Sequence, residues 1–140
     1  MKKFFLTLLA VIVISGLVAA VTVVFYRDED GCHVLDWIER LPERAYAKGF
    51  VRVERLAELG HELRRPEADY LRDGIYELRW RLGSINYRVL YFFHGREAVV
   101  LAHGLTKEGK IPNKDIDLAV KRKNLYLEMP DERAHHGELP

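Results

Sequence analysis

The hydrophobic pattern is clearest in the middle of the chain, where it predicts a β-hairpin. Two segments that alternate between apolar and polar residues, 75–82 and 85–94, are separated only by a Gly-Ser pair. A two-residue turn fixes which residues lie opposite each other, and in that register Arg79 faces Arg88. One face of the hairpin is then apolar, with Leu78, Trp80, Tyr87 and Val89, and the other is polar, with Glu77, Arg79, Arg81, Asn86 and Arg88.

The remaining pattern predicts an α+β domain. β-Branched and aromatic residues predict a first strand at 21–26, and a further strand at 97–104 completes a three-stranded meander. Apolar residues at helical spacing predict three helices, over 34–41, 43–63 and 113–127. This order indicates an antiparallel sheet, made of the N-terminal strand and the meander, packed with two N-terminal helices and one C-terminal helix.

The first twenty residues differ from the rest of the chain. Lys2 and Lys3 precede an uncharged, mostly apolar stretch from Phe4 to Ala20, which is typical of a secretory signal peptide. The uncharged run over residues 4–26 is also long enough for a membrane span. The lysines would then keep the N-terminus in the cytoplasm and place the domain on the outer side of the membrane. In a third interpretation residues 21–26 are the first strand, and residues 1–20 are an appendage or follow a misassigned translation start. All three interpretations are compatible with the sequence.

Composition narrows the possible functions. The 140 residues are enough for one domain with a core, and the net charge of +1 excludes a polycation. Between Leu71 and Lys110 there are seven basic and four acidic residues. Such an excess is expected of a nucleic-acid-binding face, although a balanced surface also shows it by chance. Cys32 is the only cysteine, which excludes an intrachain disulfide and a cysteine-based zinc site.

The arginines are the strongest candidates for a chemical role. The chain has no Gly-rich phosphate loop, no HExxH and no GxSxG, and its histidines do not follow metal-ligand spacing, so no metal site is predicted. Like charges directly opposite each other destabilise a sheet, so Arg79 and Arg88 predict an anion between them, with phosphate the leading candidate. The other basic and aromatic candidates nearby are Arg81, Tyr87, Tyr91, His103, Lys107 and Lys110.

These residue types fit RNA cleavage without a metal. The ribose 2′-OH is an internal nucleophile, so the protein must remove its proton, stabilise charge on phosphorus and protonate the leaving oxygen. Arginines supply the charge stabilisation, and a histidine, tyrosine, lysine or carboxylate transfers the protons. Tyr87 and Tyr91 are able to hold a base by stacking, but both share the apolar face, and tyrosines in such positions are more often core residues.

The chain from Val21 to Glu128 resembles the RelE/ParE toxin superfamily, and most closely the phage-derived, HigB-like toxins of type II toxin–antitoxin systems. The segments that carry the resemblance are 76–79, 86–93, 101–107, 111–112 and 116–119. The resemblance implies a small cytoplasmic toxin that inhibits translation as an mRNA interferase. Such toxins bind the ribosomal A site, cleave mRNA there without a cofactor, and are neutralised by an antitoxin that often has a helix-turn-helix domain.

The resemblance also assigns roles to individual residues. By position, Arg88 matches the family's phosphate-contacting arginine, Arg79 the basic residue of the preceding strand, and Lys107 the lysine after the last strand. The chain departs from the family at Glu108, where many relatives have a second basic residue, and at Glu77, where some have a lysine. The catalytic set is therefore Arg79, Arg88, Lys107 and His103, with His103 and Glu77 as alternatives for the general base. The residues expected to bind the substrate are Arg81, Lys110, Tyr87 and Tyr91.

Three hypotheses follow for the domain at 21–128, which the leader 1–20 precedes and a loose polar tail, 129–140, follows. The first is a ribosome-dependent mRNA endonuclease in the cytoplasm. The second is a ParE-like toxin that inhibits DNA gyrase without nuclease chemistry. The third is an exported or membrane-tethered binding domain of the same fold, with residues 4–26 as its anchor.

Overall fold

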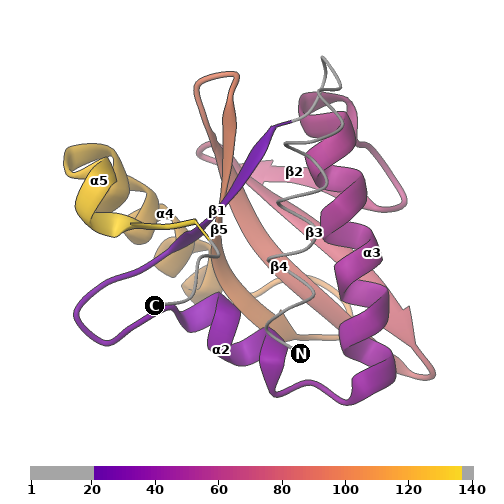
Figure 1. Ribbon diagram of the computed structural model, residues 1–140. Helices are drawn as coiled ribbons and strands as arrows, with labels where there is room; N and C mark the ends of the chain where they lie inside the picture. Colours follow the sequence, from indigo (N-terminus) through magenta and orange to yellow (C-terminus); the bar gives the residue numbers. More distant parts are fainter. Residues whose placement is uncertain (1–20, 137–140) are drawn as a thin grey trace.

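A computed structural model describes residues 21–136, which form a six-stranded sheet flanked by helices (Figure 1). The strand order is β2-β3-β4-β5-β1-β6. The strands are β1 (Thr22–Tyr26), β2 (Ala68–Arg72), β3 (Ile75–Leu82), β4 (Ile85–His94), β5 (Ala98–Thr106) and β6 (Ala134–His135). The helices are α2 (His33–Glu39), α3 (Glu43–Leu59), the 3₁₀ turn η1 (Gly60–Glu62), α4 (Asn113–Glu128) and α5 (Pro130–Arg133). The predicted α+β class is confirmed.

The central hairpin has the register that its turn predicts. Arg79 lies opposite Arg88 and Trp80 lies opposite Tyr87 across β3 and β4. Gly83 in the turn has a φ of 61°, a conformation that side chains other than glycine rarely adopt. The two-residue connection and the alternation of apolar residues therefore specify the same pairing, which places the two arginines on one face of the sheet.

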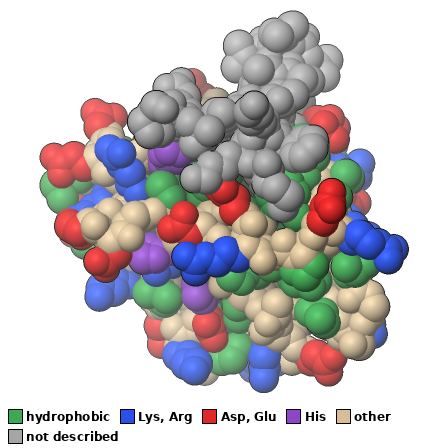
Figure 2. Space-filling model, turned by 60° about the horizontal axis from the view of Figure 1, so that its bottom comes forward, with side chains coloured by type: hydrophobic (Ala, Val, Ile, Leu, Met, Phe, Trp, Pro, Cys, Tyr) green, Lys and Arg blue, Asp and Glu red, His purple; other side chains and the backbone are tan. Residues whose placement is uncertain are grey.

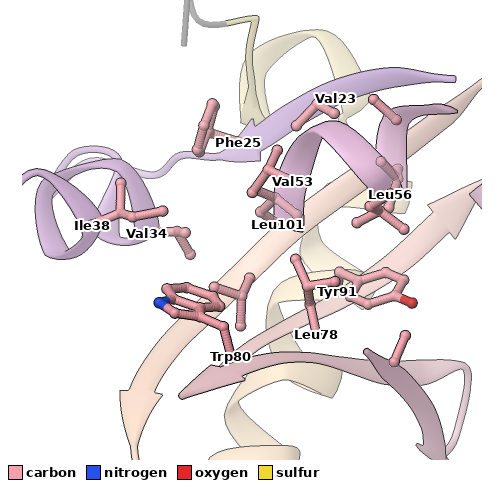
Figure 3. Packing of buried hydrophobic residues seen from close by; sticks show 14 of the residues in the cluster. Val23, Phe25, Val34, Ile38, Val53, Leu56, Leu78, Trp80, Tyr91 and Leu101 are labelled. Carbon is pink, nitrogen blue, oxygen red and sulfur yellow. The ribbon is translucent and has the colours of Figure 1, made fainter. Parts of the chain in front are cut away.

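Two hydrophobic clusters lie on opposite faces of the sheet. Helices α2 and α3 cover one face, where Leu78, Trp80 and Tyr91 from the sheet meet Val53 and Leu56 of α3 (Figure 3). Helix α4 covers the other face, and its apolar residues pack on side chains from several strands, among them Val24, Ile75, Leu90, Phe92 and Val100. Because β-strand side chains alternate between faces, Glu77, Arg79 and Arg88 share the α4 face with Ile75 and Leu90.

The sheet differs from the prediction at both edges. Strand β1 runs parallel to β5, not antiparallel, and lies between β5 and β6. A parallel neighbour requires a crossover connection, and α2, α3 and the strands after them supply it. Strand β2 was not predicted, because its sequence Ala-Asp-Tyr-Leu-Arg alternates too weakly to stand out from a loop. It forms by pairing with β3.

Two predicted ends also need correction. Helix α3 stops at Leu59 rather than at residue 63, since Gly60 takes a φ of 52° and the chain turns into η1. The tail was predicted to be loose, and this is wrong for residues 130–135, which form α5 and β6. Strand β6 pairs with β1 through Phe25 and Tyr26, and the backbone N–H of Arg27 donates to the carbonyl of Arg133 at 2.8 Å.

The predictions for residues 1–20 lie outside the described residues. The strand predicted at 21–26 is confirmed as β1, and its hydrogen-bonded place between β5 and β6 is incompatible with a membrane span that continues to Tyr26. Within residues 21–136 no helix is both long enough and apolar enough to cross a bilayer.

Candidate active site

The candidate site lies on the α4 face of strands β3, β4 and β5, next to the apolar residues that pack under α4. Two rows of side chains cross these strands on the α4 face. In the first row Glu77, Leu90 and His103 are opposite one another, and in the second row Arg79, Arg88 and Leu105 are. Three adjacent strands thus hold the charged side chains, and the ladder hydrogen bonds fix their spacing.

The centre of this region is an ion-pair cluster of Glu77, Arg79 and Arg88, here called the Glu77 cluster. Nη1 of Arg79 donates to Oε1 of Glu77 at 2.8 Å, and Nη1 of Arg88 lies 3.5 Å from Oε2 of Glu77. The negative charge that both arginines meet is therefore the protein's own carboxylate, Glu77, where the sequence led us to expect phosphate. Glu77 relieves the repulsion that two facing guanidinium groups create.

The Glu77 cluster is buried to different depths. The side chains of Glu77 and Arg88 are 5% and 10% exposed, whereas that of Arg79 is 32% exposed. Within the described residues, Oε2 of Glu77 and Nε of Arg88 are buried atoms without a hydrogen-bond partner. Nε of Arg88 is thus an unused N–H donor, which is costly in a purely structural role, while Oε2 of Glu77 is an acceptor.

His103 forms a second pair with the first turn of α4. Its Nε2 lies 2.8 Å from Oδ1 of Asp115, and both side chains are 18% exposed. Burial lowers the pKa of His103 below its ordinary value of 6.5, although the hydrogen bond to the carboxylate of Asp115 acts in the opposite direction. The imidazole is therefore neutral near pH 7, which is the form that accepts a proton.

This lowered pKa predicts a measurable pH dependence of folding. Below pH 6.5 the unfolded chain protonates His103 more readily than the folded chain does, so the free energy of unfolding falls on acidification. One proton contributes at most about 1.4 kcal/mol per pH unit. Chemical unfolding between about pH 5.5 and 7.5, roughly one unit on either side of the histidine value, measures this slope. His103→Gln should flatten it, and the exposed His136→Gln should leave it unchanged. A slope that His103→Gln does not alter would contradict the assignment.

The two predicted tyrosines belong to the core. Tyr87 stacks on Trp80 with ring centroids 5.7 Å apart, and Tyr91 stacks on Tyr76 at 5.4 Å. They are only 3% and 1% exposed, and burial raises the pKa of Tyr91. Packing accounts for both rings, and neither presents a face on which a base can stack.

The remaining predicted residues are two near the turn of the hairpin, Arg81 and Lys107, and one in the loop before α4, Lys110. Arg81, Lys107 and Lys110 are exposed, and Nε of Arg81 donates to the carbonyl of Gly83 at 2.8 Å. Lys107 directly follows β5, and its backbone N–H donates to the carbonyl of Asn86 at 3.2 Å. The structure therefore brings Arg79 and Arg88 together, with His103 one strand away and Lys107 beyond the strand ends.

A third polar group was not predicted from the sequence. Both carboxylate oxygens of Asp28 lie within 3.0 Å of Nε2 of His33. Arg122 on α4 donates to the carbonyl of Ala102 at 2.6 Å and lies over the ring of Tyr26. No three His, Cys, Asp or Glu side chains gather at metal-binding distance in residues 21–136. No local signal marks this group, because its members come from four separate segments.

Charge is mixed on the part of the surface that Figure 2 shows. Lys and Arg side chains alternate there with Asp and Glu, and histidines lie among them. The basic excess in residues 71–110 therefore does not make this face a continuous basic patch. Whether these basic residues bind an anion depends on individual groups such as the Glu77 cluster.

Comparison with known protein families finds a match for this chain. Residues 36–124 match the family model described as phage derived protein Gp49-like (DUF891). The matched segment runs from within α2 into α4, so it includes the Glu77 cluster, His103 and Asp115. No curated protein matches the chain.

Proposed function

The chain belongs to the family of phage-derived Gp49-like proteins, and on this premise we propose that it is the toxin of a type II toxin–antitoxin system and cleaves mRNA on the ribosome. The family is consistent with a toxin of such a system. The single observation that carries the nuclease proposal is the pair of facing arginines, Arg79 and Arg88, which already bind a carboxylate on the α4 face.

The proposed chemistry uses the RNA itself as nucleophile. The 2′-oxygen attacks the adjacent phosphorus, the bond from phosphorus to the 5′-oxygen breaks, and a cyclic 2′,3′-phosphate remains. Arg79 and Arg88 stabilise the negative charge that builds up on the phosphate oxygens, and their fork of N–H donors suits that geometry. Lys107 is proposed to supply the proton that the leaving 5′-oxygen takes up.

His103 is the proposed general base. It is neutral near pH 7, and Asp115 holds its Nε2 at 2.8 Å, which fixes the orientation of the ring. On β5, His103 lies opposite Leu90 of β4. Leu105, two residues further along β5, lies opposite Arg88. Glu77 is the weaker alternative, because its carboxylate is held between the two arginines.

The proposed partners follow from the family. A cognate antitoxin, with a helix-turn-helix domain as the expected type, would keep the toxin inactive in the cytoplasm. The ribosome would present the mRNA to the toxin.

Controlled expression tests this function directly. Induction of the full chain in bacteria should stop growth, and primer extension should show new mRNA ends that depend on ribosome loading. Co-expression of the neighbouring antitoxin gene should restore growth. Growth arrest with intact mRNA would contradict the nuclease proposal, and unimpaired growth with the chain detectably expressed would contradict the toxin proposal.

One observation favours a second candidate, a ParE-like toxin that inhibits DNA gyrase without nuclease chemistry. Arg88 is largely buried and Glu77 already neutralises it, so the Glu77 cluster also fits a purely structural ion pair. Growth arrest accompanied by gyrase-dependent DNA breaks, with mRNA unbroken, would identify this candidate.

A further inference from the structure

A basic hollow lies beside the open edge of β3, next to the Glu77 cluster. It has a volume of about 240 Å³ and is lined by Arg52, Pro66, Glu67, Arg79, Trp80, Arg81 and Asn86. Pairing of β2 with β3 ends at Ala68 and Leu78, so β3 has no strand neighbour on this side beyond that point in the described residues. Helix α3 and the segment before β2 form the other walls.

Positive charge exceeds negative charge in this hollow. Glu67 is its only acidic lining residue, and two arginines of α3 already bind it, Arg52 at 2.7 Å and Arg55 at 2.6 Å. These hydrogen bonds outweigh the effect of burial and lower the pKa of Glu67, so it stays ionised. Arg79 and Arg81 add two further guanidinium groups to the lining, of which Arg79 is already paired with Glu77 at 2.8 Å.

One donor in the wall is unused. Nε of Arg52 is buried and has no hydrogen-bond partner within the described residues, while Nη1 of the same side chain binds Glu67. Such an orphaned N–H carries a free-energy penalty that an acceptor in the hollow would remove.

The backbone edge of β3 is already occupied, which limits the kind of ligand. The N–H of Arg79 donates to the carbonyl of Glu67 at 2.9 Å, and Nζ of Lys48 donates to the carbonyl of Arg81 at 2.8 Å. An added peptide strand would need these groups. What remains are guanidinium and amide donors, which suit a compact anion with several acceptor oxygens.

We propose that this hollow is a second phosphate site, which binds the backbone phosphate next to the one held by Arg79 and Arg88. Arg79 belongs to both sites, since it lines the hollow and also donates to Glu77. Two anion sites that share one arginine match a ligand whose anions repeat at short intervals, as in a phosphodiester chain. The inference rests on the proposed function for its substrate, single-stranded RNA, and it assigns Arg52, Arg81 and Asn86 to substrate binding.

Binding of an uncleavable probe tests the site separately from catalysis. A short 2′-O-methyl RNA is titrated into the full chain at several salt concentrations. Arg52→Gln and Arg81→Gln should each weaken binding about tenfold and reduce the slope of log Kd against log salt by about 0.7. Arg44→Gln removes the same charge from the exposed first turn of α3 and serves as the control. Thermal unfolding of each variant confirms that it folds, and the exposed Arg81 provides a result if Arg52→Gln does not.

The outcomes separate this inference from the proposed function. Variants that bind the probe as well as Arg44→Gln does would overturn the site, even if mRNA is cleaved. Poly-glutamate that displaces the probe at equal charge concentration would overturn phosphate recognition in favour of an acidic peptide. Specific loss of binding in Arg52→Gln and Arg81→Gln supports the site, even if expression of the chain leaves mRNA intact and the nuclease proposal fails.

Discussion

Arg88→Ala is expected to abolish growth arrest and to lower ribosome-dependent mRNA cleavage by a factor of about 10² to 10³. Arg88 is the more buried of the two arginines in the Glu77 cluster, and its Nε has no partner within residues 21–136. A donor held in place before the reaction stabilises developing charge without reorganisation, so its removal should affect the transition state more than the binding of substrate. Single-turnover cleavage on programmed ribosomes measures the effect.

Two matched variants make the Arg88 result specific. Arg88→Lys keeps the charge but loses the fork of donors, so it should recover only part of the activity. Arg96→Ala removes a charge from the exposed turn between β4 and β5 and should leave cleavage unchanged. Full cleavage by Arg88→Ala would show that the Glu77 cluster has no catalytic role.

Stability must be measured beside activity for this variant. Arg88 is paired with a carboxylate that is 5% exposed, and loss of one partner of a buried pair costs about 3–5 kcal/mol when nothing replaces it. Arg79 remains bonded to Glu77 at 2.8 Å, so the cost here should lie below that range. An Arg88→Ala protein that is folded at the assay temperature yet inactive would establish a functional role.

The largest effect on folding is expected from Trp80→Ala, which should reduce the free energy of unfolding by about 3–5 kcal/mol. Trp80 is 3% exposed and joins the sheet to α3, because its Nε1 donates to the carbonyl of Ala45 at 3.0 Å. Its ring also packs edge-on against Trp37 of α2. Urea unfolding measures the loss.

Further variants separate packing from hydrogen bonding at this position. Trp80→Phe keeps most of the apolar contact and should cost less than Trp80→Ala. Gly49→Ala should also destabilise the fold, because a Cβ there would lie 2.7 Å from Cζ2 of Trp80. Val51→Ala on the exposed side of α3, where the residue is 51% exposed, is the control and should change stability by less than about 0.5 kcal/mol. A Trp80→Ala loss no larger than that of Val51→Ala would contradict the packing described for α3.

Sequence reasoning was most accurate where structure depends on near neighbours. The turn at Gly83 and the alternation on both sides of it predicted every pair of the β3–β4 hairpin, including the opposition of Arg79 and Arg88. Reasoning failed for β2 and β6, since edge strands this short form only when a neighbour is already in place. It failed in the same way for the parallel placement of β1, which depends on a crossover of many residues.

The amino-acid sequence by itself thus determined the fold class and the hairpin register, because periodicity and turn chemistry act over a few residues. Only the tertiary structure decided what each charged group meets. It placed Glu77 between the arginines, brought Asp115 to His103, and set Arg52 of α3 against Glu67 beside β3. The physical reason is that a charge is held by whichever partner packing brings within hydrogen-bond distance, and packing joins segments far apart in the chain.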